Sequence, residues 1–320
     1  MKSSSTIISQ EIKEYERLFQ EAVKSDVPLL DRITKYIVKT KGKQLRPMFV
    51  LLSAKLCGTI NASTYRAASL VELLHTATLV HDDVVDEAAE RRGFFSTYAL
   101  WKNKASVLVG DYLLAKGLLL SLENDDFKIL QILAEAVKKM SEGELLQLEK
   151  SRLLNIKEED YFTIIRNKTA SLLASACAAG AFSATGNLDL AEKMRQFGEY
   201  TGIAFQIKDD LFDYGSENVG KPTGNDIKEK KLTLPLIYTL ENTVPSTRRV
   251  IINIIKNKNK SRNEIEKVIE IVKETGGIFY ANEKMIEYKD KAEKILLDFP
   301  ESDSRSALME MLHFTTERKN

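Results

Sequence analysis

Proline is absent from the whole middle of the chain, between Pro47 and Pro222, and this absence constrains the fold more than any other feature. The intervening sequence is rich in Leu, Ala, Glu and Lys, which favour helices, whereas a proline inside a helix would cost about 3 kcal/mol. Alternating runs of β-branched residues, which would indicate strands, are few. We therefore predict an all-α chain with helices near residues 6–24, 28–39, 47–57, 63–91, 105–123, 126–150, 158–184, 188–214, 246–257, 262–275, 277–297 and 302–317.

No linker or change of composition divides these predicted helices, so we expect a single domain over residues 1–320. Residues 63–91 are apolar on almost every side, which predicts a central helix. Residues 170–184 are mostly small, which indicates either close helix packing or a helix that lines an internal cavity. The stretch from Gly215 to Thr233 reads as a long loop, and a mobile lid would be useful there.

Two acidic clusters with the same spacing lie in the predicted helices. Each has carboxylates at i, i+1 and i+4: Asp82, Asp83 and Asp86 in the first, and Asp209, Asp210 and Asp213 in the second. Residues i and i+4 share one face of a helix, so these like charges repel unless a cation lies between them. A solvated acidic face is the alternative, but it explains neither the apolar neighbours nor the repeated spacing. Because Mg²⁺ binds carboxylates together with substrate phosphates, the clusters predict a magnesium site for a polyphosphate.

Basic residues that could bind this polyphosphate surround the acidic clusters: Lys43, Arg46, Arg91, Arg92, Lys168, Lys221 and Lys231. Some have simpler explanations. Arg91 and Arg92 would favour the dipole at the end of the predicted helix, and Lys168 could be a surface lysine. His75 shares a helical stripe with Asp82 and Asp86; a lone histidine in an apolar helix is often a core residue, but this alignment favours a functional role.

The bulk composition excludes several other classes of protein. The formal net charge is +1, which gives no electrostatic reason to bind nucleic acid. Cys57 and Cys177 lack CxxC spacing, so neither a disulfide framework nor a zinc site is expected. We find no signal peptide and expect no apolar stretch of about 18 residues that could span a bilayer. These features predict a cytoplasmic protein.

Taken in order, the motifs make the chain similar to the trans-prenyltransferases, the polyprenyl diphosphate synthases. The motifs are GKQLRP at 42–47, HTATLVHDDVVD at 75–86, RRG at 91–93, KTA at 168–170, FQIKDDLFD at 205–213, GKPTGNDI at 220–227 and KLTLP at 231–235. They cover nearly the whole chain, and their shared order is far more specific than any single motif. Lys41 and Lys230 stand where the family often has glycine, but neither departure removes a side chain that the chemistry needs.

The resemblance implies an isoprenoid synthase-type bundle of about a dozen helices around a deep central cavity, assembled as a homodimer. It implies Mg²⁺-dependent condensation of an allylic diphosphate with isopentenyl diphosphate. Three Mg²⁺ ions would be bound by Asp82, Asp86 and Asp209, supported by Asp83, Asp210 and Asp213. The allylic diphosphate would contact Arg91, Lys168, Lys221 and Lys231, and isopentenyl diphosphate would contact Lys43, Arg46, His75 and Arg92. Thr169 and Gln206 would direct dipoles at the carbocation.

The same resemblance places the determinants of product length on the helix that carries Asp82. Ala77 and Thr78 lie one turn before Asp82 and are small, so a growing prenyl tail could pass them. Leu74, Val71 and the stretch Leu118–Leu122 are candidates for a deeper floor, although helix packing explains them equally well. We expect a product of six to eight isoprene units for a quinone side chain, made from farnesyl or geranyl diphosphate. The alternatives are a short-chain (farnesyl or geranylgeranyl) synthase, a terpene cyclase and a non-catalytic subunit.

Overall fold

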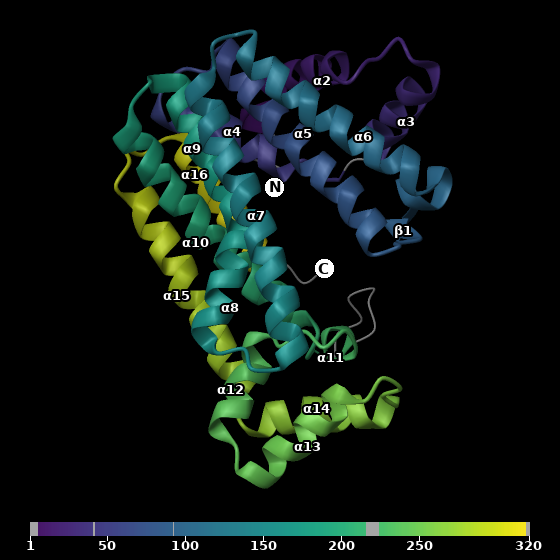
Figure 1. Ribbon diagram of the computed structural model, residues 1–320. Helices are drawn as coiled ribbons and strands as arrows, with labels where there is room; N and C mark the ends of the chain where they lie inside the picture. Colours follow the sequence, from purple (N-terminus) through teal and green to yellow (C-terminus); the bar gives the residue numbers. More distant parts are fainter. Residues whose placement is uncertain (1–5, 41, 92, 216–223, 318–320) are drawn as a thin grey trace. The chain divides into compact units, whose positions relative to one another are not determined.

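The computed structural model describes residues 6–40, 42–91, 93–215 and 224–317. Its helices, labelled in Figure 1, are α2 (Ser9–Ala22), α3 (Pro28–Lys39), α4 (Leu45–Cys57), α5 (Ala62–Val85), α6 (Thr97–Leu122), α7 (Phe127–Leu153), α8 (Glu158–Ile165), α9 (Ser171–Thr185), α10 (Leu188–Phe212), α11 (Asn225–Lys228), α12 (Leu234–Asn242), α13 (Pro245–Lys256), α14 (Arg262–Glu274), α15 (Gly277–Leu297) and α16 (Asp303–Glu317). A π-helical segment, η1 (Arg166–Ala170), joins α8 to α9. The prediction of an all-α fold is confirmed.

The predicted helices differ from the structure in three places. The first acidic helix ends at Val85, not at residue 91, and it is followed by a short hairpin of β1 (Glu90–Arg91) and β2 (Phe94–Phe95). Helix α6 begins at Thr97, where the Ser96 side chain accepts a hydrogen bond from the amide of Ala99 and caps it, but its backbone is non-helical at Lys102 (φ 63°), close to the predicted start at residue 105. Helix α12 was not predicted.

The chain forms two compact units. Unit 1 comprises residues 1–137, 172–195 and 299–308, and unit 2 comprises residues 138–171, 196–298 and 309–320. Helices α7, α10 and α16 each contribute residues to both units. The expectation of a single domain over residues 1–320 stays a prediction.

In unit 1 the central element is α5, as its apolar sequence predicted. Glycines of α6 allow that helix to approach it closely, since a Cβ at Gly117 would lie 2.8 Å from Cδ1 of Leu70. Helices α4 and α9 approach each other similarly, because a Cβ at Gly180 would lie 2.2 Å from the backbone oxygen of Val50. Of the two explanations for the small residues at 170–184, close helix packing therefore applies at Gly180.

Helix α6 also corrects one expectation. Among the described helices it alone is long and apolar enough to cross a membrane, judged by length and composition only. Asp111 and Lys116 interrupt its apolar sequence, and one face packs on α5 through Gly110, Leu113 and Gly117. Only 33% of its most apolar 18-residue stretch is buried, so the packing on α5 accounts for one face of the helix.

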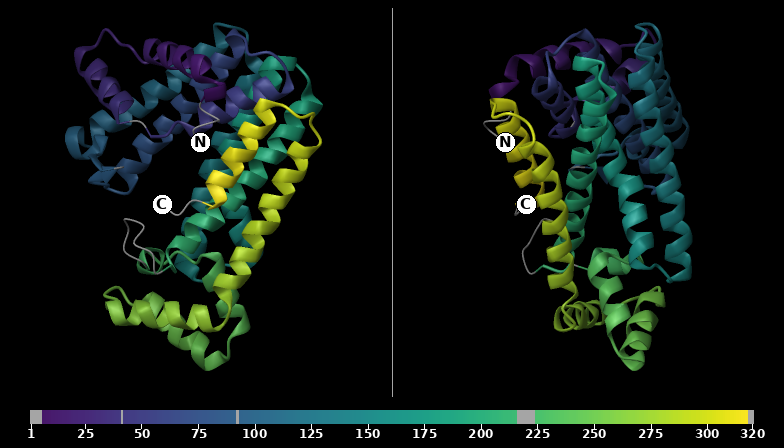
Figure 2. Two further views of the ribbon diagram at one scale, coloured as in Figure 1. Left: turned by 180° about the vertical axis from the view of Figure 1, so that it is seen from behind. Right: turned by 90° about the vertical axis from the view of Figure 1, so that its left-hand side faces the viewer.

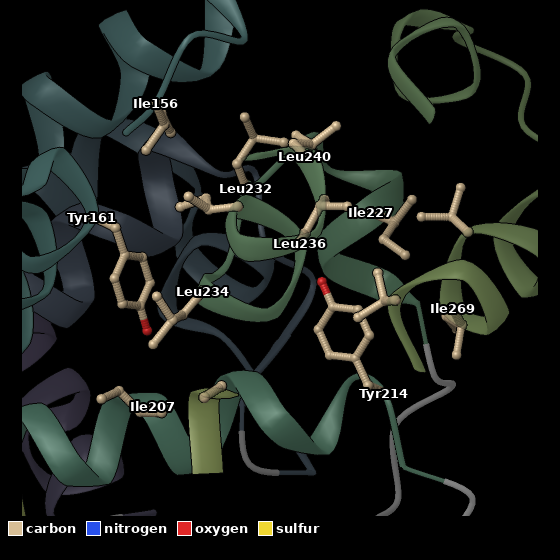
Figure 3. Packing of buried hydrophobic residues seen from close by; sticks show 14 of the residues in the cluster. Ile156, Tyr161, Ile207, Tyr214, Ile227, Leu232, Leu234, Leu236, Leu240 and Ile269 are labelled. Atoms are coloured by element: carbon tan, nitrogen blue, oxygen red, sulfur yellow. The ribbon is translucent and has the colours of Figure 1, made fainter. Parts of the chain in front are cut away.

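In unit 2 the core gathers apolar side chains from helices α8 and α10 to α15 (Figure 3). Helices α10 and α15 run side by side (Figure 2), and the ring centroids of Tyr200 and Tyr288 lie 6.0 Å apart between them. Helix α15 reaches α12 through Gly277, where a Cβ would lie 2.3 Å from the backbone oxygen of Pro235. This core holds the carboxyl-terminal end of α10, which carries the second acidic cluster.

Candidate active site

The first acidic cluster lies at the carboxyl-terminal end of α5. Asp82 and Asp86 are exposed, as expected for residues one turn apart on the outer face of a helix. Asp83 points inward, is 3% exposed, and accepts a 2.6 Å hydrogen bond from Nε of Arg91. Burial raises the pKa of Asp83, and its bond to Arg91 opposes that rise. The i+1 aspartate of this cluster therefore holds the hairpin that carries Arg91.

The amino-terminal end of α4 brings two more predicted residues together. Nη1 of Arg46 lies 2.9 Å from Nε2 of His75, which projects from α5. Gln44, which precedes the first turn of α4, has a left-handed backbone with φ 50°, and Lys43 is exposed just before it. The structure thus places Lys43, Arg46 and His75 in unit 1, with Arg46 and His75 in direct contact.

The second acidic cluster lies at the carboxyl-terminal end of α10. Asp209 is partly exposed, whereas Asp210 is buried and accepts hydrogen bonds from the hydroxyl of Tyr161, at 2.7 Å, and from Nε2 of Gln206, at 2.8 Å. Burial is the main cause that raises the pKa of Asp210 to about 7, and these two hydrogen bonds oppose it.

Asp213, the third residue of this cluster, holds the chain that follows it. Its two carboxylate oxygens accept hydrogen bonds from the backbone amides of Asn225, at 2.8 Å, and Asp226, at 3.1 Å. The Asp213 carbonyl also accepts from the amide of Gly224 at 3.0 Å. Asp213 therefore fixes the start of α11 within the stretch that we predicted to be a loop.

A cavity of about 130 Å³ in unit 2 adjoins the second cluster. Six polar residues among those that line it are Lys168, Thr169, Gln206, Asp210, Asp226 and Lys231. Nζ of Lys168 lies 2.5 Å from Oε2 of Glu144, and Nζ of Lys231 lies 2.5 Å from Oε2 of Glu229. Acidic neighbours thus pair with both lysines at the edge of this cavity. The cavity brings together five of the predicted site residues: Lys168, Thr169, Gln206, Asp210 and Lys231.

Two residues beside this cavity were missed by the sequence analysis. Asp226 lies in the GKPTGNDI motif, but no role was given to it. Tyr161 lies seven residues before Lys168, which is two helical turns, and this spacing was the available signal. Arg92 and Lys221, which we predicted to bind diphosphate, lie outside the described residues.

The predicted determinants of product length lie in unit 1. Ala77 and Leu74 are both 2% exposed on α5. Thr78 is partly exposed and donates a hydrogen bond to the carbonyl of His75 at 2.8 Å. Leu118, Leu119 and Leu122 are exposed on α6, so the suggestion that this stretch forms a floor within the chain is wrong for these three leucines.

The oxygen-rich donor set fits Mg²⁺. Within the parts of the chain that the structure describes, no three histidine, cysteine, aspartate or glutamate side chains form a compact metal-binding group. The first cluster instead presents two exposed carboxylates, Asp82 and Asp86. This agrees with the usual binding of Mg²⁺ by one or two carboxylates together with substrate phosphates.

Comparison with known proteins identifies the class. The polyprenyl synthetase family model matches residues 27–272, so the chain belongs to this family. The predicted enzyme class, a prenyltransferase of the polyprenyl diphosphate synthase type, and the isoprenoid synthase fold are therefore confirmed.

The chain is 36% identical over 314 residues to the all-trans-nonaprenyl-diphosphate synthase (geranyl-diphosphate specific) of Rhodobacter capsulatus, covering 97% of this chain and 96% of that protein. It is also 36% identical over 300 residues to the octaprenyl diphosphate synthase of Escherichia coli (strain K12), covering 93% of each. Among solved structures, a decaprenyl diphosphate synthase from Rhodobacter capsulatus matches with a TM-score of 0.93 and 34% identity, over 99% of this chain and 98% of that one. A polyprenyl synthase from Caulobacter crescentus CB15, complexed with calcium and isoprenyl diphosphate, matches with a TM-score of 0.90 and 34% identity, over 100% and 98%.

Proposed function

We propose that this chain lengthens an allylic diphosphate by successive condensations with isopentenyl diphosphate. The observation that carries the proposal is the unit 2 cavity, where Lys168, Lys231, Thr169 and Gln206 line one space beside the second acidic cluster. Ionisation of an allylic diphosphate leaves negative charge on the diphosphate and positive charge on carbon. Two cations and two neutral dipoles in one cavity suit both parts of that charge separation.

The metal would be Mg²⁺, in three ions, with Asp82, Asp86 and Asp209 as direct ligands. When bound, it neutralises the charge that develops on the leaving diphosphate. Asp83, Asp210 and Asp213 would support the site mainly through the contacts described above, since each of these carboxylates accepts hydrogen bonds from the protein. Calcium in the related Caulobacter crescentus structure supports a requirement for a divalent cation.

The two diphosphates would bind different residues. Lys168 and Lys231, with Arg91 and Lys221, would bind the allylic diphosphate, and Lys43, Arg46 and His75, with Arg92, would bind isopentenyl diphosphate. The direct contact of Arg46 with His75, and the single cavity that Lys168 and Lys231 line, support this division. A charge-assisted contact with a phosphate is stronger than a neutral hydrogen bond, so the loss of one such lysine or arginine should clearly weaken binding. Because each residue would contact only one of the two diphosphates, its loss should affect mainly that substrate.

The product would contain six to eight isoprene units, suited to a quinone side chain, and farnesyl or geranyl diphosphate would be the primer. The octaprenyl and nonaprenyl synthases among the relatives support a medium-to-long product. We further propose that residues 1–320 act as a single polyprenyl synthase domain in the cytoplasm.

A homodimer would explain the exposed apolar face of α6. The large apolar side chains exposed on this helix are Leu100, Val107, Leu108, Leu118, Leu119 and Leu122. Leu108, Leu118, Leu119 and Leu122 lie on one side of the helix and form an apolar stripe, which the exposed Asp111 interrupts. Exposed apolar surface of this kind is typical of an interface with another protein. Isologous contact between two copies would bury the stripe.

The test is incubation of the purified protein with Mg²⁺, farnesyl diphosphate and labelled isopentenyl diphosphate, followed by phosphatase treatment and measurement of the products. Elongated prenyl alcohols, absent when the metal is chelated, would support the proposal. Products that stop at farnesyl or geranylgeranyl length would indicate a short-chain synthase, and cyclic hydrocarbons a terpene cyclase. An absence of turnover would indicate a non-catalytic subunit.

A further inference from the structure

A chain of three hydrogen bonds in unit 2 connects a tyrosine outside the motifs to the predicted catalytic threonine. The hydroxyl of Tyr161 donates to Oδ2 of Asp210 at 2.7 Å, and Nε2 of Gln206 donates to Oδ1 of Asp210 at 2.8 Å. The hydroxyl of Thr169 then donates to Oε1 of Gln206 at 2.9 Å. All four residues line the same cavity.

The directions of these hydrogen bonds determine which atom of Thr169 faces the cavity. A carboxylate can only accept, so Asp210 requires the NH₂ group of Gln206 to point toward it. The carbonyl oxygen of Gln206 must then point toward Thr169, whose hydroxyl has to donate to it. The hydroxyl hydrogen is therefore engaged, and the oxygen lone pairs of Thr169 remain to face a ligand in the cavity.

Tyr161 is placed to hold this arrangement. It is buried, and Figure 3 shows its hydroxyl pointing toward the helix that carries Ile207, which is α10. By donating to Oδ2 it leaves Oδ1 of Asp210 to Gln206, and it fixes the plane of the carboxylate. Close packing helps in the same way, since a Cβ at Gly202 on α10 would lie 2.6 Å from Cα of Ala170, next to Thr169.

We propose that Tyr161 is a positioning residue for the condensation, acting through Asp210 and Gln206 so that Thr169 presents an acceptor oxygen to the developing allylic cation. The inference rests on the proposed function, because only a reaction that creates positive charge on carbon gains from lone pairs held at that position. It also gives Asp210 a task other than binding metal, since both of its oxygens already accept hydrogen bonds from the protein.

The test compares Tyr161→Phe with Tyr280→Phe. Tyr280 is a matched control, because its hydroxyl also donates to a carboxylate, that of Glu158 at 2.8 Å, in the same unit but away from the lining of this cavity. The rate of the first condensation should be measured in a single turnover, with the Michaelis constants for both substrates and the thermal midpoint. We expect Tyr161→Phe to slow the single turnover by about 10- to 100-fold with an unchanged KM for isopentenyl diphosphate. Tyr280→Phe should change the rate by no more than about twofold, and it should cost less thermal stability than Tyr161→Phe, which leaves an oxygen of the buried Asp210 without its donor.

A double-mutant cycle shows whether Tyr161 acts through Thr169. In a Thr169→Val background, which lacks the hydroxyl but keeps the shape, the further change Tyr161→Phe should have no additional effect on the rate. If Tyr161→Phe does not fold, Gln206→Glu replaces it, since this variant removes the N–H donor and leaves Tyr161 intact. It too should slow the reaction in the wild-type background, and its effect should be smaller beside Thr169→Val; some loss should remain there, because Gln206 lines the cavity with a dipole of its own.

A wild-type rate in Tyr161→Phe, or fully additive losses in either cycle, would overturn the inference while leaving the proposed function in place. An inactive wild-type protein would instead overturn the proposed function itself. Equal losses of rate in Tyr161→Phe and Tyr280→Phe would also overturn the inference, because they would show a general effect of losing a tyrosine hydroxyl that donates to a carboxylate.

Discussion

Nη1 of Arg46 donates a hydrogen bond to Nε2 of His75 over 2.9 Å, joining α4 to α5. An arginine has donors only, so Nε2 of His75 must accept, and the imidazole is neutral with its proton on Nδ1. Two residues that are 29 positions apart in the sequence therefore act as one group. The motif GKQLRP and the histidine of the first acidic helix should contribute to one substrate site.

This pairing predicts the effects of substitution on the isopentenyl site. Arg46→Ala and Lys43→Ala should raise the KM for isopentenyl diphosphate by about 10- to 150-fold, because each removes a charge-assisted phosphate contact. Lys168→Ala should raise the KM for the allylic substrate instead. His75→Gln, whose side-chain oxygen can replace Nε2 as an acceptor, should retain more affinity than His75→Leu. Initial-rate kinetics with each substrate varied in turn provide the measurement, and equal effects of all variants on both substrates would contradict the division of sites.

The second prediction concerns the metal ligands. Asp82→Ala and Asp209→Ala should each lower turnover by about 100- to 1,000-fold or more while leaving the fold intact, since each removes a charge that Mg²⁺ would balance. Circular dichroism and the thermal midpoint check the fold, and calorimetric titration with Mg²⁺ and a diphosphate checks metal binding. Asp303→Ala, at an exposed aspartate in the first turn of α16, is the control. Wild-type turnover by both variants at saturating Mg²⁺ would refute the metal assignment.

The helical fold could be predicted because a long proline-free sequence leaves few alternatives, but the ends of helices depend on local contacts. Helix α5 ends at Val85 because Glu87 adopts a left-handed backbone with φ 49° and Asp83 holds Arg91 in a hairpin. Neither feature can be read from composition. Helix α12 has no counterpart among the predicted helices, although Pro235 in its first turn is compatible with a helix.

The candidate site was predictable at the level of motifs but not of individual carboxylates. The spacing of Asp82 and Asp86 predicted that they share a face of the helix, and both residues are exposed in the structure. The i+1 residues, Asp83 and Asp210, lie about 100° further round the helix, and which side of the helix is buried depends on tertiary packing. The hydrogen bond between Tyr161 and Asp210 crosses 49 positions of sequence, and no local pattern contains it.

The third prediction follows from the contacts of Asp213. Asp213→Ala should raise the KM for the allylic diphosphate more than it lowers turnover, because Asp226 and Lys231 line the cavity and follow the backbone that Asp213 holds. Loss of this cap should lower the free energy of unfolding by about 1–2 kcal/mol, measured by urea denaturation, with Asp213→Asn intermediate. A loss of turnover as complete as that of Asp209→Ala, with unchanged stability, would show that Asp213 binds metal directly.

The fourth prediction concerns assembly. Leu108→Lys and Leu119→Glu should each convert the protein to a monomer at micromolar concentration, because a charge in the apolar stripe of α6 would be buried without a partner. Light scattering after size-exclusion chromatography gives the mass. Phe279→Glu is the control, since this residue is exposed on α15 and lies outside the stripe. A monomeric wild-type protein, or two dimeric variants, would refute the proposed interface.

The fifth prediction concerns product length. Ala77→Tyr should shorten the product to three or four isoprene units while preserving the first condensation, because the added ring would block a tail one turn beyond the metal site. Each turn of α5 adds about 5.4 Å, close to one extended isoprene unit, so Leu74→Ala, nearly one turn deeper, should instead lengthen the product. Chromatography of the dephosphorylated alcohols measures both.

Thermal stability provides an independent check of the same prediction. Ala77 is 2% exposed, and a tyrosine forced into a fully packed core would cost about 1–3 kcal/mol or more. If a tunnel passes this position, Ala77→Tyr should instead keep a thermal midpoint close to that of the wild type, because the ring would enter space otherwise filled by the tail. An unchanged product length with a large loss of stability would show that Ala77 belongs to the packing between helices. A wild-type product that stops at farnesyl diphosphate would likewise contradict the prediction, because it would show that no open tunnel passes Ala77 and Thr78.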